Sequence, residues 1–470
     1  MAEKSSLHVA LFPWLAFGHI IPYLELSKFI LQKGHKVTFI STPRNIHRLP
    51  KIPPDLASSI TFLKIPLPQV EGLPQNAEAT LDVRTQDIPF LKKAYDGLEP
   101  DLTHFLENSL PDWIVYDFSA YWLPPIATKL GISKAFFSIL SASSRVFFGP
   151  SDFAVNGTDP RKKAEDFKAP PQWVPFQTKV AYKSHEINWI MGAGQVNESG
   201  ISDMYRYGTV AKGSDVIFVR HCYEFEGQWL NLLNELEQKP VIPVGLMPPK
   251  MEEGSSHDNN ESWVLMKEWL DGLERASVVY IAFGSEVSLS QQELSELALG
   301  LELSKVPFFW CLRKPPGSTE FSSFELPNGF EERIRGRGFV WKSWAPQLKI
   351  LSHESIGGFL THCGWSSSIE GLMFGHPLIM LPFVIDTGLV ARVLEDKQVG
   401  VEVLRNEQDG SYTRNSVADS VRLVMVENSG KVYREKAKEI CEIFGDRDLH
   451  DGYIRKVIDY LENNGRRKSG

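Results

Sequence analysis

The stretch that most restricts the fold is residues 344–387, in which apolar runs alternate with turns and a helix. Residues 356–360 read IGGFL, a short apolar run that is typical of a buried strand. The run ends in a turn that contains Gly364, and a helix is predicted to begin at Ser366. A second apolar run covers residues 378–384. These elements predict one βαβ unit, and a helix N-terminus that follows the carboxyl end of a strand attracts phosphate.

The same alternation of apolar runs and helical stretches continues through both halves of the chain. The predicted strands outside the first stretch cover residues 8–13, 36–42, 60–65, 113–116, 135–139, 216–220, 278–283 and 308–312. Strands that alternate with helices predict a parallel sheet covered on both faces. We therefore expect the α/β class, with two Rossmann-like doubly wound domains that face each other across a cleft.

The boundary between these domains is marked by composition. A chain of 470 residues is too long for one ordinary core. Residues 248–262 read PPKMEEGSSHDNNES and contain almost no apolar side chain, so we interpret them as a linker. This predicts a first domain over residues 1–247 and a second over residues 263–450. Residues 150–189 are irregular and rich in Pro and Lys, which indicates a loop or lid over a cleft.

Charge and cysteine content narrow the partners and the compartment. The chain is 43% hydrophobic and 23% charged with a net charge of −8, which is typical of a globular protein and argues against nucleic acid or an anionic membrane as partner. Positive charge at a phosphate site must then be local or be replaced by helix dipoles. No apolar run approaches the roughly 18 residues of a membrane span. Cys222, Cys311 and Cys363 lie in or beside apolar runs and are predicted to be buried free thiols, so we expect a cytoplasmic protein.

Several features of residues 344–387 together resemble the signature box of plant secondary-product glycosyltransferases, the plant family 1 UDP-glycosyltransferases. WAPQ begins at Trp344 and HCGW at His362, Glu370 follows the tryptophan of HCGW by five residues, and the acidic Asp386 is next to last. The opening segments PWLAFGHIIPYLELSKFI and STPRNIHRLP resemble the branch that adds sugars onto existing glycosides. The resemblance covers nearly the whole chain. It implies the GT-B fold, with the C-terminal residues 451–470 packed back on the first domain.

The resemblance also implies the residues that bind UDP. Trp344 would stack on uracil, since an indole gives area and orientation to a flat ring. The Ala345 backbone and Gln347 would contact the base and the ribose. Glu370 would accept hydrogen bonds from both ribose hydroxyls. A competing interpretation makes Ser367 and Glu370 a helix capping box. The expected diphosphate contacts are Ser285, His362, Gly364, Ser366 and Ser367, with Ser366 in place of the usual asparagine.

The sugar end matches the family less well. Trp365 and Asp386 correspond to residues that contact the transferred sugar. Thr387 stands where the family commonly has glutamine, and the shorter side chain cannot reach or donate in the same way. This difference favours a donor without a 6-hydroxyl, such as UDP-rhamnose or a pentose, with UDP-glucose as the other candidate.

Transfer from a UDP-sugar needs a base for the acceptor hydroxyl, and histidine with a reference pKa near 6.5 suits that task. His19 is expected in the loop after the first strand, and Asp117 follows the fourth strand, both at carboxyl ends where cleft residues gather. In the family these positions hold the catalytic histidine and the carboxylate that orients it, as in a serine hydrolase. Attack from the face opposite UDP inverts the anomeric carbon.

The acceptor is expected in the first domain, where aromatic and polar side chains could form one wall, although most aromatic residues in any protein are core. The candidates are Trp14, Phe17, Tyr121, Trp122, Phe136, Ser141 and Arg145. A mixed wall of this kind fits a flavonoid, terpenoid or saponin glycoside.

Taken together, the sequence predicts a monomeric, inverting UDP-sugar-dependent transferase that adds rhamnose, glucose or a pentose to the existing sugar of a small plant glycoside. No metal and no cofactor are expected, because the sequence contains no HExxH, Walker A or GxGxxG motif. Asp446-Arg447-Asp448 resembles a metal-binding DxD, but it follows a late helix far from any strand end and is interpreted as solvated surface. One alternative is a glucosyltransferase for plain aglycones. The other is a non-catalytic protein that binds nucleotide sugars.

Overall fold

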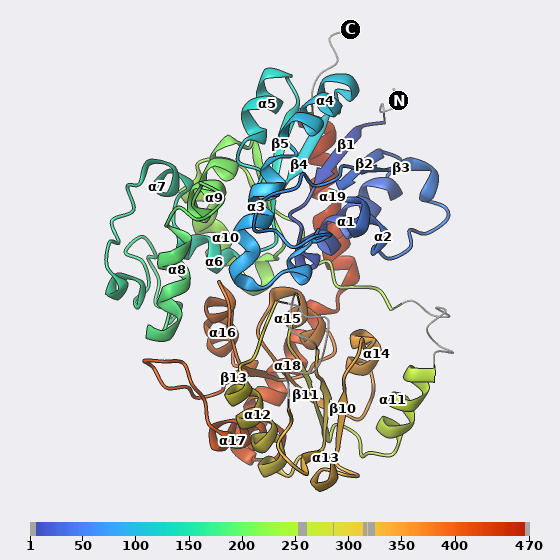
Figure 1. Cartoon of the computed structure of the whole chain (residues 1–470), viewed down its shortest axis with the longest axis vertical. Helices are drawn as coiled ribbons and strands as arrows, with labels where there is room; N and C mark the ends of the chain where they lie inside the picture. Colours follow the sequence, from blue (N-terminus) through green and yellow to red (C-terminus); the bar gives the residue numbers. More distant parts are fainter. Residues whose placement is uncertain (1–5, 252–260, 285, 314–316, 318–324, 466–470) are drawn as a thin grey trace. The chain divides into compact units, whose positions relative to one another are not determined.

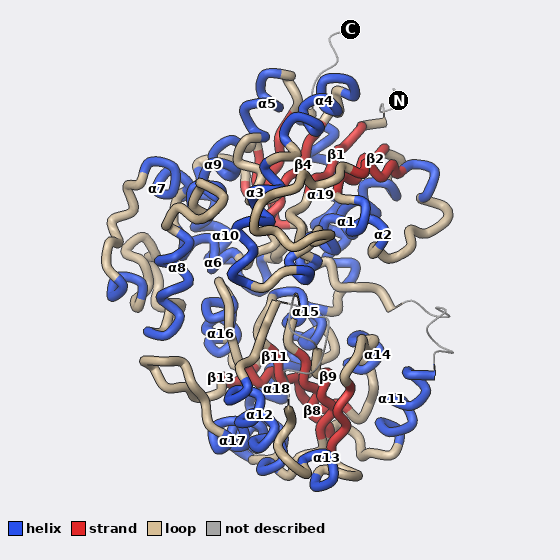
Figure 2. Tube along the Cα trace, in the orientation of Figure 1, coloured by secondary structure: helices blue, strands red, loops and turns tan. Residues whose placement is uncertain are grey.

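The computed structural model describes residues 6–251, 261–284, 286–313, 317 and 325–465. The chain divides into two compact units: one comprises Met1–Lys162, Ile190–Met247 and Asp448–Gly470, and the other comprises Lys163–Trp189 and Pro248–Arg447. Each unit contains its own parallel β-sheet with helices packed around it (Figure 1, Figure 2). The predicted α/β class with two doubly wound sheets is therefore confirmed. Most of the predicted linker, residues 252–260, lies outside the described residues.

The sheet of the first unit has seven strands in the order β3-β2-β1-β4-β5-β6-β7 within the described residues. Its strands are β1 (His8–Phe12), β2 (Lys36–Ser41), β3 (Ile60–Lys64), β4 (Trp113–Tyr116), β5 (Ser133–Ser138), β6 (Val216–Val219) and β7 (Val241–Pro243). All pairs are parallel. The strand order changes direction between β1 and β4, and ligands of doubly wound sheets bind beyond the carboxyl ends of the strands at such a point.

Helices cover both faces of this sheet. The helices of this unit are α1 (Phe17–Gln32), α2 (Pro43–His47), α3 (Ile88–Asp96), α4 (Glu99–Ser109), α5 (Leu123–Lys129), α6 (Ala142–Phe148), α7 (Ser151–Asn156), α9 (Asp203–Gly213), α10 (Tyr223–Glu237) and α19 (Arg447–Asn464). Helix α8 (Ile187–Ala193) begins in the second unit and ends in the first. The last helix packs its apolar stripe, including Ile454 and Leu461, into the core around β1 and β4. The indole of Trp113 donates to the Leu461 carbonyl over 2.9 Å, which fixes α19 against β4.

The sheet of the second unit has six described strands in the order β10-β9-β8-β11-β12-β13, again all parallel. They are β8 (Val278–Ala282), β9 (Phe308–Cys311), β10 (Gly338–Trp341), β11 (Ile356–Thr361), β12 (Leu378–Met380) and β13 (Gly400–Glu402). The helices are α11 (Glu261–Asp271), α12 (Gln291–Ser304), α13 (Phe330–Arg333), α14 (Gln347–Leu351), α15 (Trp365–Leu372), α16 (Thr387–Asp396), α17 (Arg414–Met425) and α18 (Lys431–Phe444). Here the order changes direction between β8 and β11.

Two features differ from the sequence-based expectation. Residues 163–189, expected in the first domain, group with the second unit, where they form the short helices η4 (Ala164–Phe167) and η5 (Ser184–Glu186). Helix α1 begins at Phe17, so His19 lies in its first turn instead of in the preceding loop.

The cysteines follow the prediction. Cys222, Cys311 and Cys363 are buried free thiols, and burial raises the pKa of each. Over the described ranges, no helix is long and apolar enough to cross a bilayer.

Candidate functional site

The structure brings His19 and Asp117 together beyond the carboxyl ends of β1 and β4. His19 Nδ1 lies 2.8 Å from Asp117 Oδ2, and the aspartate is almost fully buried while the histidine side chain is 18% exposed. The same carboxylate accepts the backbone amides of Trp14, at 3.0 Å, and Phe118, at 2.7 Å. These amides fix the carboxylate, and it in turn fixes the imidazole.

This arrangement selects one form of the imidazole. A carboxylate accepts hydrogen bonds, so the neutral ring of His19 carries its proton on Nδ1 and its basic nitrogen is Nε2. When Nε2 takes a proton, the Asp117 charge stabilises the imidazolium. The ring of Phe118 lies 5.6 Å from that of His19 and limits how it can turn. The pair is therefore built to accept a proton from a bound hydroxyl.

The predicted acceptor residues separate into two groups. Phe17 and Tyr121 keep part of their surface exposed, and the Tyr121 ring lies beneath the Arg206 guanidinium at 4.9 Å. Trp14 is 3% exposed and packs edge-on against Tyr95. Phe17 and Tyr121 remain candidates for an acceptor wall, whereas Trp14 contributes mainly through the amide that holds Asp117.

The other four predicted acceptor residues are part of the core, which corrects the sequence-based expectation. Trp122 packs on Phe12, and Phe136 is 1% exposed. Ser141 caps α6 by accepting the Ser144 amide. Arg145 is fully buried, pairs with Glu237 at 2.9 Å and stacks on Phe136. These side chains expose at most 6% of their surface, so they pack mainly within the protein.

In the second unit, His362 joins the two strands at which the sheet order changes direction. It follows β11, and its Nδ1 accepts the Gly284 amide, which follows β8, over 3.1 Å. The neutral ring therefore carries its proton on Nε2, where it can serve as a donor. An added Cβ would lie 2.6 Å from Nε2 at Gly284 and 2.5 Å from it at Gly364. The ring thus lies between two glycines, and neither position has room for a side chain.

The His362 ring is neutral at physiological pH. Burial, followed by the positive charge of Arg313, lowers the pKa of His362 to about 4. The ring is therefore a neutral N–H donor, and any positive charge for a diphosphate must come from elsewhere. Arg313 follows β9 and lines a small hollow together with Gly284 and Ser288. Sequence reasoning missed Arg313, although an arginine directly after the buried run FFWCL was a usable signal.

The remaining predicted diphosphate residues lie around the start of α15. Gly364 is the N-cap of this helix, and Ser366 and Ser367 occupy its first turn, both half-buried. Backbone amides at such a helix start attract anions. Ser285 lies outside the described residues.

The predicted nucleoside residues cluster at α14 and α15. Trp344 is 57% exposed, and its carbonyl accepts the Trp341 indole N–H over 2.9 Å, while the neighbouring Ala345 is buried. The Gln347 amide donates to Glu370 over 2.6 Å. An exposed indole beside a held carboxylate suits a base and a ribose. The capping-box alternative is wrong, because α15 begins at Trp365 and Glu370 lies inside it.

The predicted sugar residues lie at the starts of α15 and α16. The Thr387 hydroxyl accepts the Val384 amide at 3.1 Å and donates to the Val384 carbonyl at 2.7 Å, and the residue is 5% exposed. The Trp365 indole is also buried and packs edge-on against Phe444 at 6.1 Å. Asp386 is the half-buried N-cap of α16. The Thr387 hydroxyl and the Trp365 ring thus have partners within the protein, and contact of Trp365, Asp386 and Thr387 with the sugar stays a prediction.

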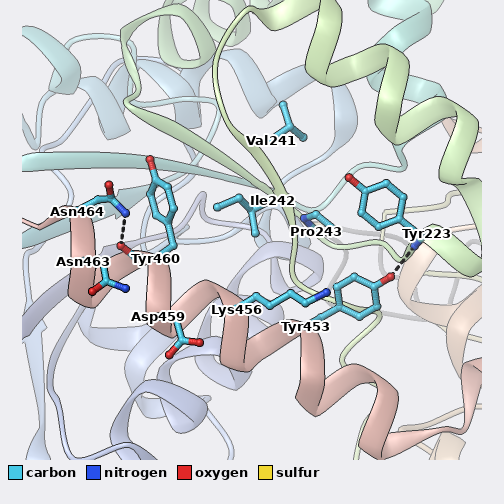
Figure 3. A pocket seen from close by; sticks show the side chains of 10 residues that line it. All are labelled: Tyr223, Val241, Ile242, Pro243, Tyr453, Lys456, Asp459, Tyr460, Asn463 and Asn464. Atoms are coloured by element: carbon cyan, nitrogen blue, oxygen red, sulfur yellow. Dashed lines mark hydrogen bonds between the residues drawn. The ribbon is translucent and has the colours of Figure 1, made fainter.

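A separate hollow of about 450 Å³ lies in the first unit between the edge strand β7 and α19 (Figure 3). Tyr453 forms part of its wall, held by a hydrogen bond from its hydroxyl to Glu224 at 2.8 Å. None of the predicted site residues lines it. Asp446, Arg447 and Asp448 are exposed, and the described part of the chain has no cluster of three or more His, Cys, Asp or Glu side chains placed to hold a metal.

Comparison with known proteins gives a consistent assignment. The family model described as UDP-glucoronosyl and UDP-glucosyl transferase matches residues 245–451. UDP-glycosyltransferase 91D2 of Stevia rebaudiana is 53% identical over 465 residues, which cover 99% of this chain and 96% of that protein. Soyasaponin III rhamnosyltransferase of Glycine max is 45% identical over 468 residues, with 98% and 96% coverage.

Solved structures agree on the fold. The crystal structure of Glycyrrhiza uralensis UGT73P12, complexed with glycyrrhetinic acid 3-O-monoglucuronide, matches with a TM-score of 0.79 at 22% identity. The match covers 98% of this chain and 96% of that one. With two doubly wound sheets, a His–Asp pair and the signature residues gathered at strand ends, the chain has the GT-B fold and belongs to the plant family 1 UDP-glycosyltransferases.

Proposed function

We propose that this UDP-glycosyltransferase inverts the anomeric carbon as it transfers a sugar to a hydroxyl of a small plant glycoside, on the sugar that the glycoside already carries. The observation that carries the proposal is the 2.8 Å contact between His19 Nδ1 and Asp117 Oδ2. It supplies a base for an acceptor hydroxyl and a buried carboxylate for the imidazolium. A protein that only bound nucleotide sugars would need neither group.

Different residues of the second unit bind the uracil, the ribose and the diphosphate of UDP. The exposed Trp344 indole stacks on the uracil, and Glu370, positioned by Gln347, accepts the ribose hydroxyls. The first turn of α15, the His362 N–H and the Arg313 guanidinium meet the diphosphate and stabilise the charge that develops as UDP leaves.

The acceptor residues act at the other end of the reaction. His19 Nε2 removes the proton from the acceptor hydroxyl as its oxygen attacks the sugar carbon. The attack comes from the face opposite UDP, so the configuration at that carbon inverts. Asp117 keeps the imidazole oriented throughout and neutralises its charge after proton transfer.

The proposal that the acceptor already carries a sugar is supported by the names of two similar proteins. Soyasaponin III rhamnosyltransferase and the anthocyanidin-3-O-glucoside rhamnosyltransferase of Petunia hybrida both have names that describe glycoside acceptors and a rhamnosyl donor. We therefore propose a flavonoid or terpenoid glycoside as acceptor, including saponins, and UDP-rhamnose, UDP-glucose or a UDP-pentose as donor. The donor choice no longer draws support from the length of Thr387, because its hydroxyl faces the protein backbone.

The test is a matrix of donors and acceptors. UDP release is measured with UDP-rhamnose, UDP-glucose and UDP-xylose against flavonol and triterpenoid aglycones and their monoglucosides. We expect turnover with at least one monoglucoside, and little with its aglycone. Faster turnover of the aglycones would replace the proposal with an aglycone glucosyltransferase. His19→Ala should abolish turnover but leave UDP affinity unchanged, and normal turnover by this variant would require another base.

A further inference from the structure

Residues 163–189 make a specific contact with the helix that begins beside the proposed sugar-binding Asp386. Glu186, at the end of η5, forms a two-point ion pair with Arg392 of α16. Arg392 Nη1 donates to Glu186 Oε1 at 3.0 Å and Nη2 donates to Oε2 at 2.9 Å. Both side chains are buried. A paired fork of this kind fixes both position and angle.

The ion pair reaches the first turn of α16. Arg392 Nη1 also donates to the Gly388 carbonyl, so one guanidinium joins Glu186 to the helix start. An added Cβ on Gly388 would lie 2.3 Å from Glu186 Oε1 and 2.6 Å from Arg392 Nη1. The carboxylate therefore packs directly on the helix backbone, two residues after Asp386.

A second acidic residue balances the charge. Glu402 of β13 lies 3.6 Å from Arg392 and 2.8 Å from the ammonium of Lys183, and Lys183 belongs to the same segment as Glu186. Glu186, Glu402, Arg392 and Lys183 thus form a cluster with two charges of each sign. The side chains of Glu186, Glu402 and Arg392 are buried, whereas that of Lys183 is 38% exposed. The three buried groups tolerate little displacement, because an unpaired buried charge is strongly unfavourable.

We infer that Glu186 is a positioning residue for the donor sugar. Through Arg392 and Gly388 it sets the place of the α16 N-terminus and hence of Asp386. The inference rests on the proposed function, in which Asp386 accepts hydroxyls of the transferred sugar. It assigns residues 163–189, expected to be a loop or lid, to the donor site. The proposed UDP contacts lie on α14, α15 and the ends of β8 and β11. In the described residues, the hydrogen bonds and ion pairs of the Glu186 carboxylate go to Lys183, His185 and Arg392, none of which is a proposed UDP contact.

The experiment compares two ligands on the same protein. Kd values of UDP and of UDP-glucose and UDP-rhamnose are measured by calorimetry for the wild type and for Glu186→Gln, which keeps the shape and removes the charge. We expect the Kd of the UDP-sugar that the wild type binds more tightly to rise about tenfold, since small misplacements are felt strongly at such sites. The Kd of UDP should stay within about twofold. An unchanged ratio of the two Kd values, or an equal rise of both, would overturn the inference.

Controls separate positioning from loss of structure. Glu165→Gln removes an exposed carboxylate of the same segment that pairs with Lys168, and it should change neither Kd. Glu186→Asp keeps the charge, so the Kd of the UDP-sugar should rise less than in Glu186→Gln, again with little change in the Kd of UDP. If Glu186→Gln does not fold, Glu186→Asp decides the question by the same ratio. Because the test measures the binding of UDP and of UDP-sugars without an acceptor, it is independent of the acceptor. A wrong acceptor class appears only as absent turnover by the wild type.

Discussion

The Gly284 amide donates a hydrogen bond to Nδ1 of His362 over 3.1 Å and so joins the loops after β8 and β11. This contact leaves the ring proton on Nε2 and holds the imidazole between Gly284 and Gly364. Backbone groups of the second unit therefore hold the His362 ring in one place.

Substitution of Gly364 by alanine tests whether UDP binding depends on this position of the His362 ring. The new Cβ would lie 2.5 Å from His362 Nε2, so the ring must move or the α15 N-terminus must shift. We expect UDP affinity to fall about tenfold or more, because donors to phosphate lose their alignment. Calorimetry with UDP measures the effect. Gly192→Ala is the matched control, since a Cβ there meets nothing within 4 Å, and an equal loss in both variants would contradict the explanation.

Asp117→Asn tests the orientation of the base. Three hydrogen-bond donors, the amides of Trp14 and Phe118 and His19 Nδ1, face the two carboxylate oxygens. An amide offers one oxygen and one NH₂ group, so at least one donor faces another donor. We expect kcat to fall roughly 10²- to 10⁴-fold because the imidazolium loses its counter-charge. UDP affinity should be unchanged, and a variant with near-normal kcat would refute the role of Asp117.

The buried His362 predicts a pH dependence of stability. Its pKa is lowered to about 4 in the folded protein, whereas an unfolded histidine titrates near 6.5. Between these values the unfolded chain binds the extra proton, so the free energy of unfolding falls as pH falls from about 6.5 to 4. Protonation linked to His362 should make the free energy of unfolding at pH 4.5 about 2 to 3 kcal/mol lower than at pH 7.

The measurement is urea unfolding of wild type and His362→Asn at both pH values. Asparagine can still accept a hydrogen bond from the Gly284 amide but does not titrate. Between pH 7 and pH 4.5 the variant should therefore lose about 2 to 3 kcal/mol less free energy of unfolding than the wild type. Parallel curves for the two proteins would show that His362 is protonated in the folded state over this range.

Thr387→Gln distinguishes two accounts of the sugar end. If the side chain read the donor, the exchange would shift preference towards UDP-glucose. In the structure the Thr387 hydroxyl instead accepts the amides of Phe383 and Val384 and donates to the Val384 carbonyl. We therefore expect kcat/KM to fall by a similar factor for every UDP-sugar, about five- to fiftyfold if one or two buried hydrogen bonds are lost. Thr387→Ser keeps the hydroxyl and should retain most activity, and a selective change among donors would restore the first account.

Much of the fold followed from the sequence because its signals are local. The strands β4 and β11 are short apolar runs, and their ends place Asp117 and His362 directly. The strands β7, β10 and β13 were not predicted. β7 and β13 each have only three residues and no alternating pattern, and β7 ends in Pro243, which is typical of an edge strand.

The sequence by itself determined two doubly wound sheets, the family, and the order of the site residues along the chain. These depend on apolar periodicity and on motifs with fixed spacing. Tertiary structure alone decided that residues 163–189 pair with α16, that Arg145 and Phe136 are core, and that Thr387 faces the backbone. The direction of a side chain and the partner of a charge are set by groups far away in the sequence. Glu186 and Arg392, separated by 206 positions, become neighbours only when the chain has folded.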